Sequence, residues 1–273
     1  MKKIKKIITL MFLFATSVTY AQFSNTGGGR NISKSSEDYN KVSFRLQVGT
    51  NISSVNMYAM DYDFFVDDNK PLIGVNVGFR VDKQFNRYFA FQTGLDYSLK
   101  GGKASYYYSY SDVIYECDGK NKLSMHYIQI PILVGARYDF NGKVPVQLQF
   151  NTGPYVAVAV AGKLKDNYSE YYESYDYSNG TYEYEYSDRE DKYNAFGNIE
   201  KEDEVLGLKR FDMGWRFDLG VDINKFYLGL AYDLGFFDFQ NEDVKKENKE
   251  YYGKNAYIPL KNGTFSVNIG CRF

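Results

Sequence analysis

Three features of this 273-residue sequence could support catalysis, metal binding or recognition: a single histidine, clustered carboxylates and a run of tyrosines. His126 is the only imidazole, and so the only histidine available as a general base. No serine nucleophile stands beside it in a catalytic pattern, and its alternation with Ile128 and Ile130 predicts an outward-facing side chain. We therefore expect a structural histidine and a protein that is not an enzyme.

The clustered carboxylates are candidates for a divalent cation site. Asp61, Asp63, Asp67 and Asp68 lie close together, but they lack the glycine and the closing glutamate of an EF-hand loop. Ordinary solvation accounts for such a cluster. The sequence therefore predicts no metal site and no cofactor.

The tyrosines gather in the most acidic part of the chain. Residues 163–208 carry thirteen Asp or Glu against five Lys or Arg, together with nine tyrosines. Thr181 to Tyr186 alternates with period two, and Asn179-Gly180 is a strong hairpin-turn signal, so we expect a β-hairpin with these two residues at its tip. Tyrosine offers a large contact area at low entropic cost, which makes such a segment a candidate recognition loop, although a solvated, variable surface without a ligand has the same composition. The candidate recognition residues are Tyr171, Tyr172, Tyr175, Tyr177, Tyr182, Tyr184 and Tyr186.

The elements that must position these residues are strands. Eight stretches alternate apolar and polar residues, at about 42–52, 72–85, 88–101, 123–140, 145–162, 209–223, 226–237 and 263–273. One face is apolar throughout, as in Phe265, Val267 and Ile269 of the last stretch. The other face carries six cations and seven anions, which must pair if they share a narrow interior. We expect a lumen ion-pair network that includes Arg45, Arg80, Asp96, Arg137, Asp212, Arg216, Asp218 and Asp233.

The connections between these stretches alternate in length. Asn86-Arg87, Asn141-Gly142 and Asn224-Lys225 are tight turns, whereas about 53–71, 102–122, 163–208 and 238–262 are long. The mean hydropathy is −0.47, and no apolar run reaches the roughly 18 residues that a transmembrane helix needs. The pattern predicts an all-β fold: an eight-stranded antiparallel up-and-down transmembrane β-barrel with long extracellular loops. The alternative is a soluble β-sandwich or lipocalin-like barrel, whose apolar face would turn inward.

The N-terminus has the features of a signal peptide. Four lysines precede the apolar run Ile7 to Val18, and we place cleavage between Ala21 and Gln22. The predicted organisation is a signal peptide at 1–21, a flexible periplasmic linker at 22–41 and an outer-membrane barrel at 42–273. Removal of the four lysines takes the formal charge from −1 to −5, which argues against a nucleic-acid partner. Cys117 and Cys271 fall at opposite ends of the predicted barrel, too far apart for a disulfide.

Three of the strands resemble a known family. The segment Tyr127 to Tyr138 (YIQIPILVGARY) is similar to the mid-barrel strand of the PorT-like outer-membrane β-barrel family of Bacteroidota. Gly153-Pro154-Tyr155-Val156 and Leu228 to Gly235 resemble the strand that follows it and the penultimate strand, and Phe273 resembles a C-terminal insertion signal. The resemblance implies the cell outer membrane and an OmpA/OmpX-like barrel. Its namesake assists protease secretion, but a shared barrel does not transfer that role.

The predicted function is therefore structural: a scaffold in outer-membrane lipid that displays tyrosine-rich acidic extracellular loops for surface recognition or adhesion, with an unknown extracellular ligand. The alternative is a transport or secretion accessory with an envelope partner protein, or a narrow porin-like channel. The charge balance of the interior counts against the channel. Residues 23–41 offer a surface for a periplasmic partner.

Overall fold

The computed structural model describes residues 42–57, 66–110, 114–140, 142–176, 178–197, 205–251 and 258–273. The predicted signal peptide and linker, Asp61, Asp63 and Tyr177 lie outside these residues. The strands of the described part are β1 (Val42–Val55), β2 (Val66–Gln84), β3 (Phe89–Tyr110), β4 (Ile114–Phe140), β5 (Val146–Asp176), β6 (Thr181–Asn194), β7 (Phe211–Ile223), β8 (Phe226–Gly235) and β9 (Asn262–Arg272), and its helix is α3 (Glu242–Tyr251).

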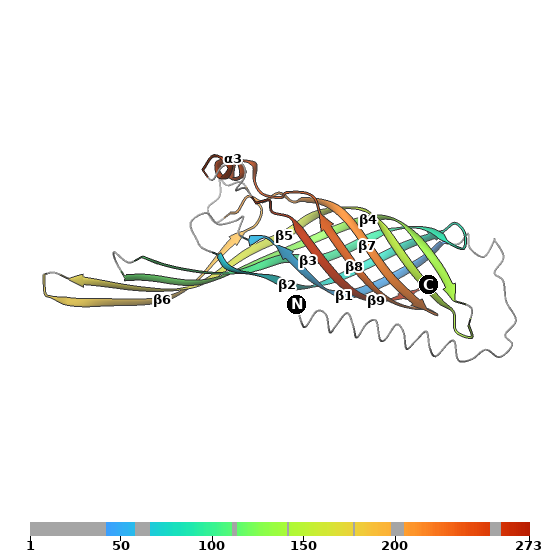
Figure 1. Cartoon of the computed structure of the whole chain (residues 1–273), viewed down its shortest axis with the longest axis horizontal. Coiled ribbons are helices and arrows are strands. Elements are labelled where there is room, and N and C mark those ends of the chain that lie inside the picture. The colour runs from blue at the N-terminus through green and yellow to red at the C-terminus, as the bar shows by residue number, and fades with distance from the viewer. Residues whose placement is uncertain are drawn as a thin grey trace.

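Eight of the strands close into a ring. Each of β1, β2, β3, β4, β5, β7, β8 and β9 pairs antiparallel with the next, and β9 returns to β1, with Val48 opposite Ile269. Figure 1 shows the strands crossing the barrel obliquely, as ring closure requires. The structure confirms the predicted eight-stranded antiparallel up-and-down barrel.

The two faces of the barrel wall differ as the alternation predicts. Large apolar side chains point outward along every strand of the ring, and Ile73 and Phe226 are the most exposed of them, at 72% and 71%. Polar and charged side chains point inward and are buried. This arrangement is the reverse of a soluble β-sandwich or lipocalin-like barrel. Val146, an apolar residue at the start of β5, is an exception: it is buried where the register sets it between the larger Phe140 and Ile223.

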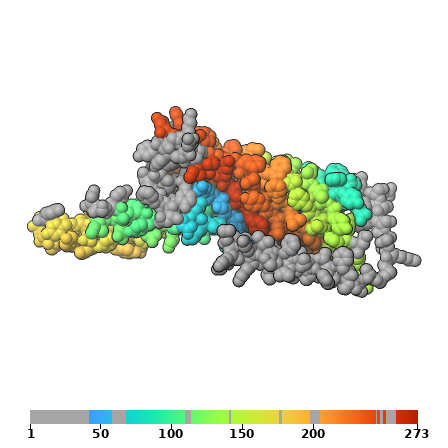
Figure 2. Space-filling model, viewed as in Figure 1, coloured from blue at the N-terminus to red at the C-terminus, as the bar shows by residue number. Residues whose placement is uncertain are grey.

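The barrel has two unlike ends. At one, which we call the short-turn end, only residues 85–88, 141–145 and 224–225 connect the strands. At the other, the long-connection end, β3, β4 and β5 continue well beyond the ring and β6 pairs with β5 alone. These continuations form a projecting sheet, made of residues 103–110, 114–122, 163–176 and 181–194. Figures 1 and 2 show it extending far from the barrel.

The projecting sheet corrects two of the predicted loops. Much of 102–122 and 163–208, expected to be long connections apart from one hairpin, is paired strand from Lys103 opposite Lys122 to Tyr110 opposite Tyr115, and onward into β5 and β6. The physical reason is that the alternation continues past the last apolar residues in tyrosine and polar residues, so neighbouring strands keep pairing. The predicted hairpin is confirmed: Asn179 and Gly180 lie in its turn, and Gly180 has a φ of 70°.

The connection from β8 to β9 contains a helix that the sequence pattern did not predict. The side chain of Asn241 accepts a hydrogen bond from the backbone N–H of Asp243 at 2.8 Å, which caps the first turn of α3. Glu242 and Asp243 favour that turn, and Lys249 favours the last one. In the described part of the chain, no helix is both long and apolar enough to span a membrane.

Candidate functional sites inside the barrel and on the projecting sheet

A chain of charged groups crosses the middle of the barrel. Arg80 of β2 makes a bidentate ion pair with Asp96 of β3. Asp96 also accepts a hydrogen bond from Arg216 of β7 at 2.6 Å, and Arg216 continues to Asp233 of β8 through two contacts, of 2.5 and 3.0 Å. Lys100 completes the chain at 3.4 Å from Asp233. Because β3 and β7 lie far apart around the ring, Arg216 ties opposite walls together.

A second cluster lies nearer the short-turn end. Arg137 and Arg272 both contact Asp82, at 2.9 and 3.3 Å, and Arg272 also contacts Asp222 at 2.8 Å. Asn151 accepts a hydrogen bond from Arg137 at 2.7 Å. The five side chains come from five strands of the ring, so this cluster also braces the lumen.

The remaining predicted lumen residues are held by neutral groups. Asp212 accepts a hydrogen bond from Asn262 at 2.9 Å, and Asp218 accepts one from Tyr227 at 3.1 Å. The guanidinium of Arg45 lies 3.5 Å from the centre of the Tyr227 ring. The structure therefore places all eight lumen residues inside the barrel, but it joins only Arg80, Asp96, Arg216, Asp233 and, separately, Arg137 into ion pairs with described residues.

Sequence reasoning missed an apolar cap above these charges. Phe196 and Leu208, from the connection between β6 and β7, pack in one buried cluster with Phe239 and Leu260, from the connection between β8 and β9. Tyr127 and Tyr155 of the barrel wall join this cluster from below. The signal was present, since these are isolated large apolar residues in otherwise polar connections. Only their burial together shows that they close the mouth of the barrel.

The interior is therefore filled at each level. Arg137 is 2% exposed near the short-turn end, Arg80 and Gln129 are fully buried in the middle, and Leu260 is fully buried in the apolar cap. An eight-stranded barrel has room for little beyond its own side chains. The arrangement favours a rigid plug over an open pore.

The projecting sheet carries the candidate recognition tyrosines on one of its faces. Tyr171 is opposite Tyr186, and Tyr175 is opposite Tyr182, so their side chains share a face. Tyr184 shares it as well, with its ring centre 6.4 Å from those of both Tyr171 and Tyr182. We call these five residues the tyrosine face. Three of them are among the most exposed side chains of the sheet: Tyr182 at 58%, Tyr184 at 63% and Tyr186 at 66%.

The other two candidates do not belong to the tyrosine face. Tyr172 is opposite Tyr115 and Glu185, on the reverse side of the sheet, which continues the inner wall of the barrel. Tyr177 lies outside the described residues. The seven tyrosines are therefore not one surface, because residues 171 and 172 are neighbours in sequence and must point in opposite directions in a strand.

The reverse side of the projecting sheet is a hydrogen-bonded network. Tyr106 donates to Asp166 at 2.9 Å, Tyr115 to Glu170 at 2.5 Å and Tyr168 to Asp191 at 2.9 Å. Burial raises the pKa of Tyr168 to about 12, and the bond to Asp191 acts in the same direction. The phenols therefore stay neutral and serve as donors that hold the four strands together. The tyrosine face is thus presented on a braced support.

The cysteines and the histidine lie in the barrel wall and its extension, and their contacts are those of structural residues. Cys117 is buried in β4 opposite Tyr108, burial raises the pKa of its thiol, and it forms no disulfide with Cys271. His126 is partly exposed on the outward side of β4, where its Nδ1 lies 2.6 Å from the hydroxyl of Tyr97. The rings of His126 and Tyr97 are 5.9 Å apart, an aromatic contact at the rim of the barrel.

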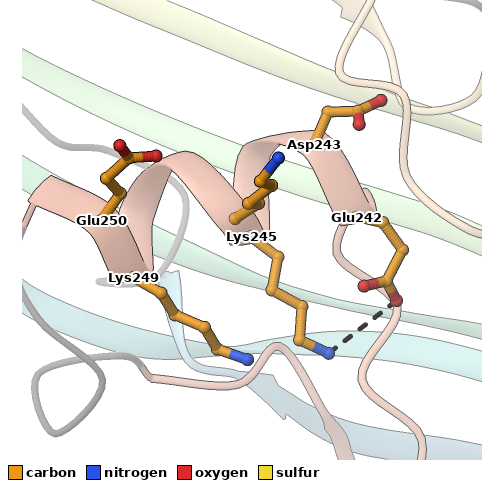
Figure 3. A pocket seen from close by; sticks show the side chains of 6 residues that line it. Glu242, Asp243, Lys245, Lys249 and Glu250 are labelled. Atoms are coloured by element: carbon orange, nitrogen blue, oxygen red, sulfur yellow. Dashed lines mark ion pairs between the residues drawn. The ribbon is translucent and has the colours of Figure 1, made fainter.

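A shallow pocket on α3 is lined only by charged side chains (Figure 3). Lys245 lies 3.9 Å from Glu242 and 3.1 Å from Asp238, so its ammonium group is held by neighbouring carboxylates. The pocket lacks the apolar walls typical of a small-molecule site. Among the described residues, no group of histidine, cysteine or acidic side chains has a metal-binding arrangement.

Comparison with known proteins places these features in context. A family model described as outer membrane protein beta-barrel domain matches residues 14–241. The comparison with curated proteins finds no match.

Solved structures that are similar to the chain include Ail, the attachment invasion locus protein of Yersinia pestis, in complex with the heparin analogue sucrose octasulfate. It is 15% identical, with 85% of this chain and 99% of that chain covered and a TM-score of 0.33. Neisserial surface protein A is 13% identical, with 85% and 97% covered and a TM-score of 0.29. OprG from Pseudomonas aeruginosa is 9% identical, with 86% and 97% covered and a TM-score of 0.30.

Proposed function

Since the chain belongs to the outer membrane protein beta-barrel domain family, we propose that it is a recognition scaffold of the outer membrane, with the projecting sheet displayed on the cell surface. In this proposal the barrel is the rigid anchor and the tyrosine face binds an extracellular macromolecule. The barrel neither conducts nor catalyses. The long-connection end faces outward, as short turns are periplasmic in such barrels.

One observation carries the proposal: five tyrosines lie side by side on an exposed face of a sheet that projects from a filled barrel. Tyrosine is enriched at protein interfaces because a rigid ring buries much surface at little entropic cost. Tyr175 and Tyr182 have ring centres 4.9 Å apart, which makes a continuous aromatic surface. The tyrosine face lies beyond the closed ring of strands, where it does not pack into the barrel, which supports a role in binding.

The recognition test uses a Gram-negative host that displays the full chain and surfaces coated with fibronectin, laminin or collagen. We expect adhesion above that of cells without the chain. The variant Tyr182→Ser/Tyr184→Ser/Tyr186→Ser should lower it about tenfold or more, as loss of a central aromatic contact does. Tyr184→Ser alone and Tyr172→Ser form a matched pair, since they remove one tyrosine from the tyrosine face and one from the reverse side.

The outcomes separate recognition from the alternatives. Equal adhesion of the triple variant and the parent would refute recognition by the tyrosine face. Single-channel currents from the full chain in a planar bilayer would favour a narrow channel. Recovery of an envelope protein with the full chain, lost on deletion of residues 23–41, would favour a secretion accessory.

A further inference from the structure

A row of lysines crosses the strands where the barrel wall passes into the projecting sheet. The register sets five of them directly opposite one another on successive strands from β2 to β6, which we call the lysine row: Lys70, Lys103, Lys122, Lys165 and Lys192. Residues paired in this way have Cβ atoms about 4.5–5.5 Å apart and point to the same side. The ammonium groups therefore form one band across the sheet.

Such a band is unfavourable unless anions lie beside it, because like charges directly opposite destabilise a sheet. Two members of the row have partners at its ends: Lys70 is 2.9 Å from Asp68, and Lys192 is 2.5 Å from Glu190. Glu190 is also 3.3 Å from Lys165. Within the described part of the chain, Lys103 and Lys122 at the centre of the row make no ion pair, although both are exposed.

The row lies on the continuation of the apolar outer wall of the barrel. On β3, Lys103 points to the same outward side as Leu95 and Leu99. On β5, Lys165 points to the same outward side as Val160, after a register shift opposite His126. Four residues from Leu99 to Lys103 span about 13 Å along a strand. With a strand tilt of about 35–45°, Lys103 stands roughly 10 Å above the last apolar residue. A lysine side chain that bends back from this height reaches the head-group layer.

We propose that the lysine row binds the phosphate-bearing head groups of anionic lipids in the membrane leaflet on the long-connection side. Charge complementarity and continuity with the lipid-facing wall both point to this occupant. The charge beyond the row is consistent with it, because the same side of the sheet carries Glu116 and Glu173 there, which an anionic surface repels. Lipid bound at the row and repulsion beyond it hold the base of the sheet to the membrane and its tip away.

The test is native mass spectrometry of the full chain from detergent micelles that contain equal amounts of phosphatidylglycerol and phosphatidylcholine. The wild-type chain should retain phosphatidylglycerol in preference. Lys103→Ser/Lys122→Ser/Lys165→Ser should lose at least about tenfold of that preference, since each lysine near an anionic surface is worth about fivefold. The matched control Lys143→Ser/Lys225→Ser/Lys246→Ser removes equal charge from two short turns and α3, and it should keep the preference.

A heat-modifiable shift on a gel verifies that each variant has folded, and Lys122→Ser is the milder variant if the triple one does not fold. Added inorganic pyrophosphate distinguishes the lipid from a soluble anion. Retention of phosphatidylglycerol in its presence supports a lipid site, whereas displacement at equimolar pyrophosphate would show a general anion site and overturn the proposal. Equal lipid retention by the row variant and the control variant would overturn it as well.

Discussion

Replacement of Arg216 tests how much the ion pairs in the barrel interior contribute to the stability of the fold. The guanidinium contacts Asp96 at 2.6 Å and Asp233 at 2.5 and 3.0 Å, and its side chain is only 7% exposed. Arg216→Met keeps a long, flexible side chain and removes the charge and all three contacts. Asp96 keeps Arg80, and Asp233 keeps Lys100 at 3.4 Å, so neither carboxylate is left wholly alone.

The expected loss of unfolding free energy follows from this geometry. Breaking a buried ion pair costs about 3–5 kcal/mol when one charge stays behind, and the remaining cations favour the lower end, about 3 kcal/mol. In Arg216→Met/Asp233→Asn the carboxylate that has lost its closer cation is also removed. The double variant should therefore be less destabilised than the single ones predict, with a coupling of about 2 kcal/mol.

Urea unfolding of the full chain in lipid vesicles measures these values. Trp215, the only tryptophan, lies on the outward face and reports the transition by its fluorescence. With a slope of about 2 kcal/mol per molar urea, Arg216→Met should lower the midpoint by about 1.5 M. Lys165→Met, which breaks the exposed pair with Glu190, is the control and should leave the midpoint unchanged. A loss below about 1 kcal/mol for Arg216→Met is what a solvent-exposed ion pair contributes, and it would refute a filled lumen in which Arg216 is buried and paired.

Three further predictions concern the cap and the projecting sheet. Phe239→Ala removes a fully buried ring from the apolar cap, and it should lower the unfolding free energy by about 3–5 kcal/mol in the same urea assay. Gly119→Ala places a methyl group 2.0 Å from the Tyr106 ring, so it should displace that ring and break its hydrogen bond to Asp166. Trypsin should then cleave faster within residues 103–122, while the barrel stays folded. Burial raises the pKa of Asp166 above its usual 3.8, so the folded sheet binds more protons than the unfolded chain near that pH. The folded sheet should therefore gain stability as the pH falls from the raised pKa towards 3.8. After correction for the intrinsic pH dependence of amide exchange, protection in β5 and β6 should increase in the parent as the pH falls towards 3.8, and Asp166→Asn should abolish this increase.

The alternation of residue types made the barrel predictable. In a strand, neighbouring side chains point to opposite sides, so the order of apolar and polar residues decides which face meets lipid before any contact forms. The tight turns after Phe85, Phe140 and Ile223 set the hairpins in the same local way. Strand ends were less predictable: β3 runs to Tyr110, not to about 101, because strand pairing continues wherever a neighbouring strand is present.

The projecting sheet depends on strand neighbours that local sequence patterns do not predict. Asn179-Gly180 was sufficient to predict the hairpin of β5 and β6. It did not predict that β6 pairs with β5 alone, or that β4 and then β3 extend the sheet on the other edge of β5. The division of the candidate tyrosines between two faces depends on this register. So does the lysine row, whose five members are spread from residue 70 to residue 192.

The sequence by itself determined that this chain is a membrane barrel with a polar, charged interior and tyrosine-rich extensions, because period-two alternation is a local property of a strand. Only the tertiary structure decided which charges pair, as with Asp96 and Arg216, which are 120 residues apart. It also decided that four apolar side chains from separate connections close the mouth of the barrel. These contacts depend on ring closure, which brings distant strands and connections together at distances that no local pattern encodes.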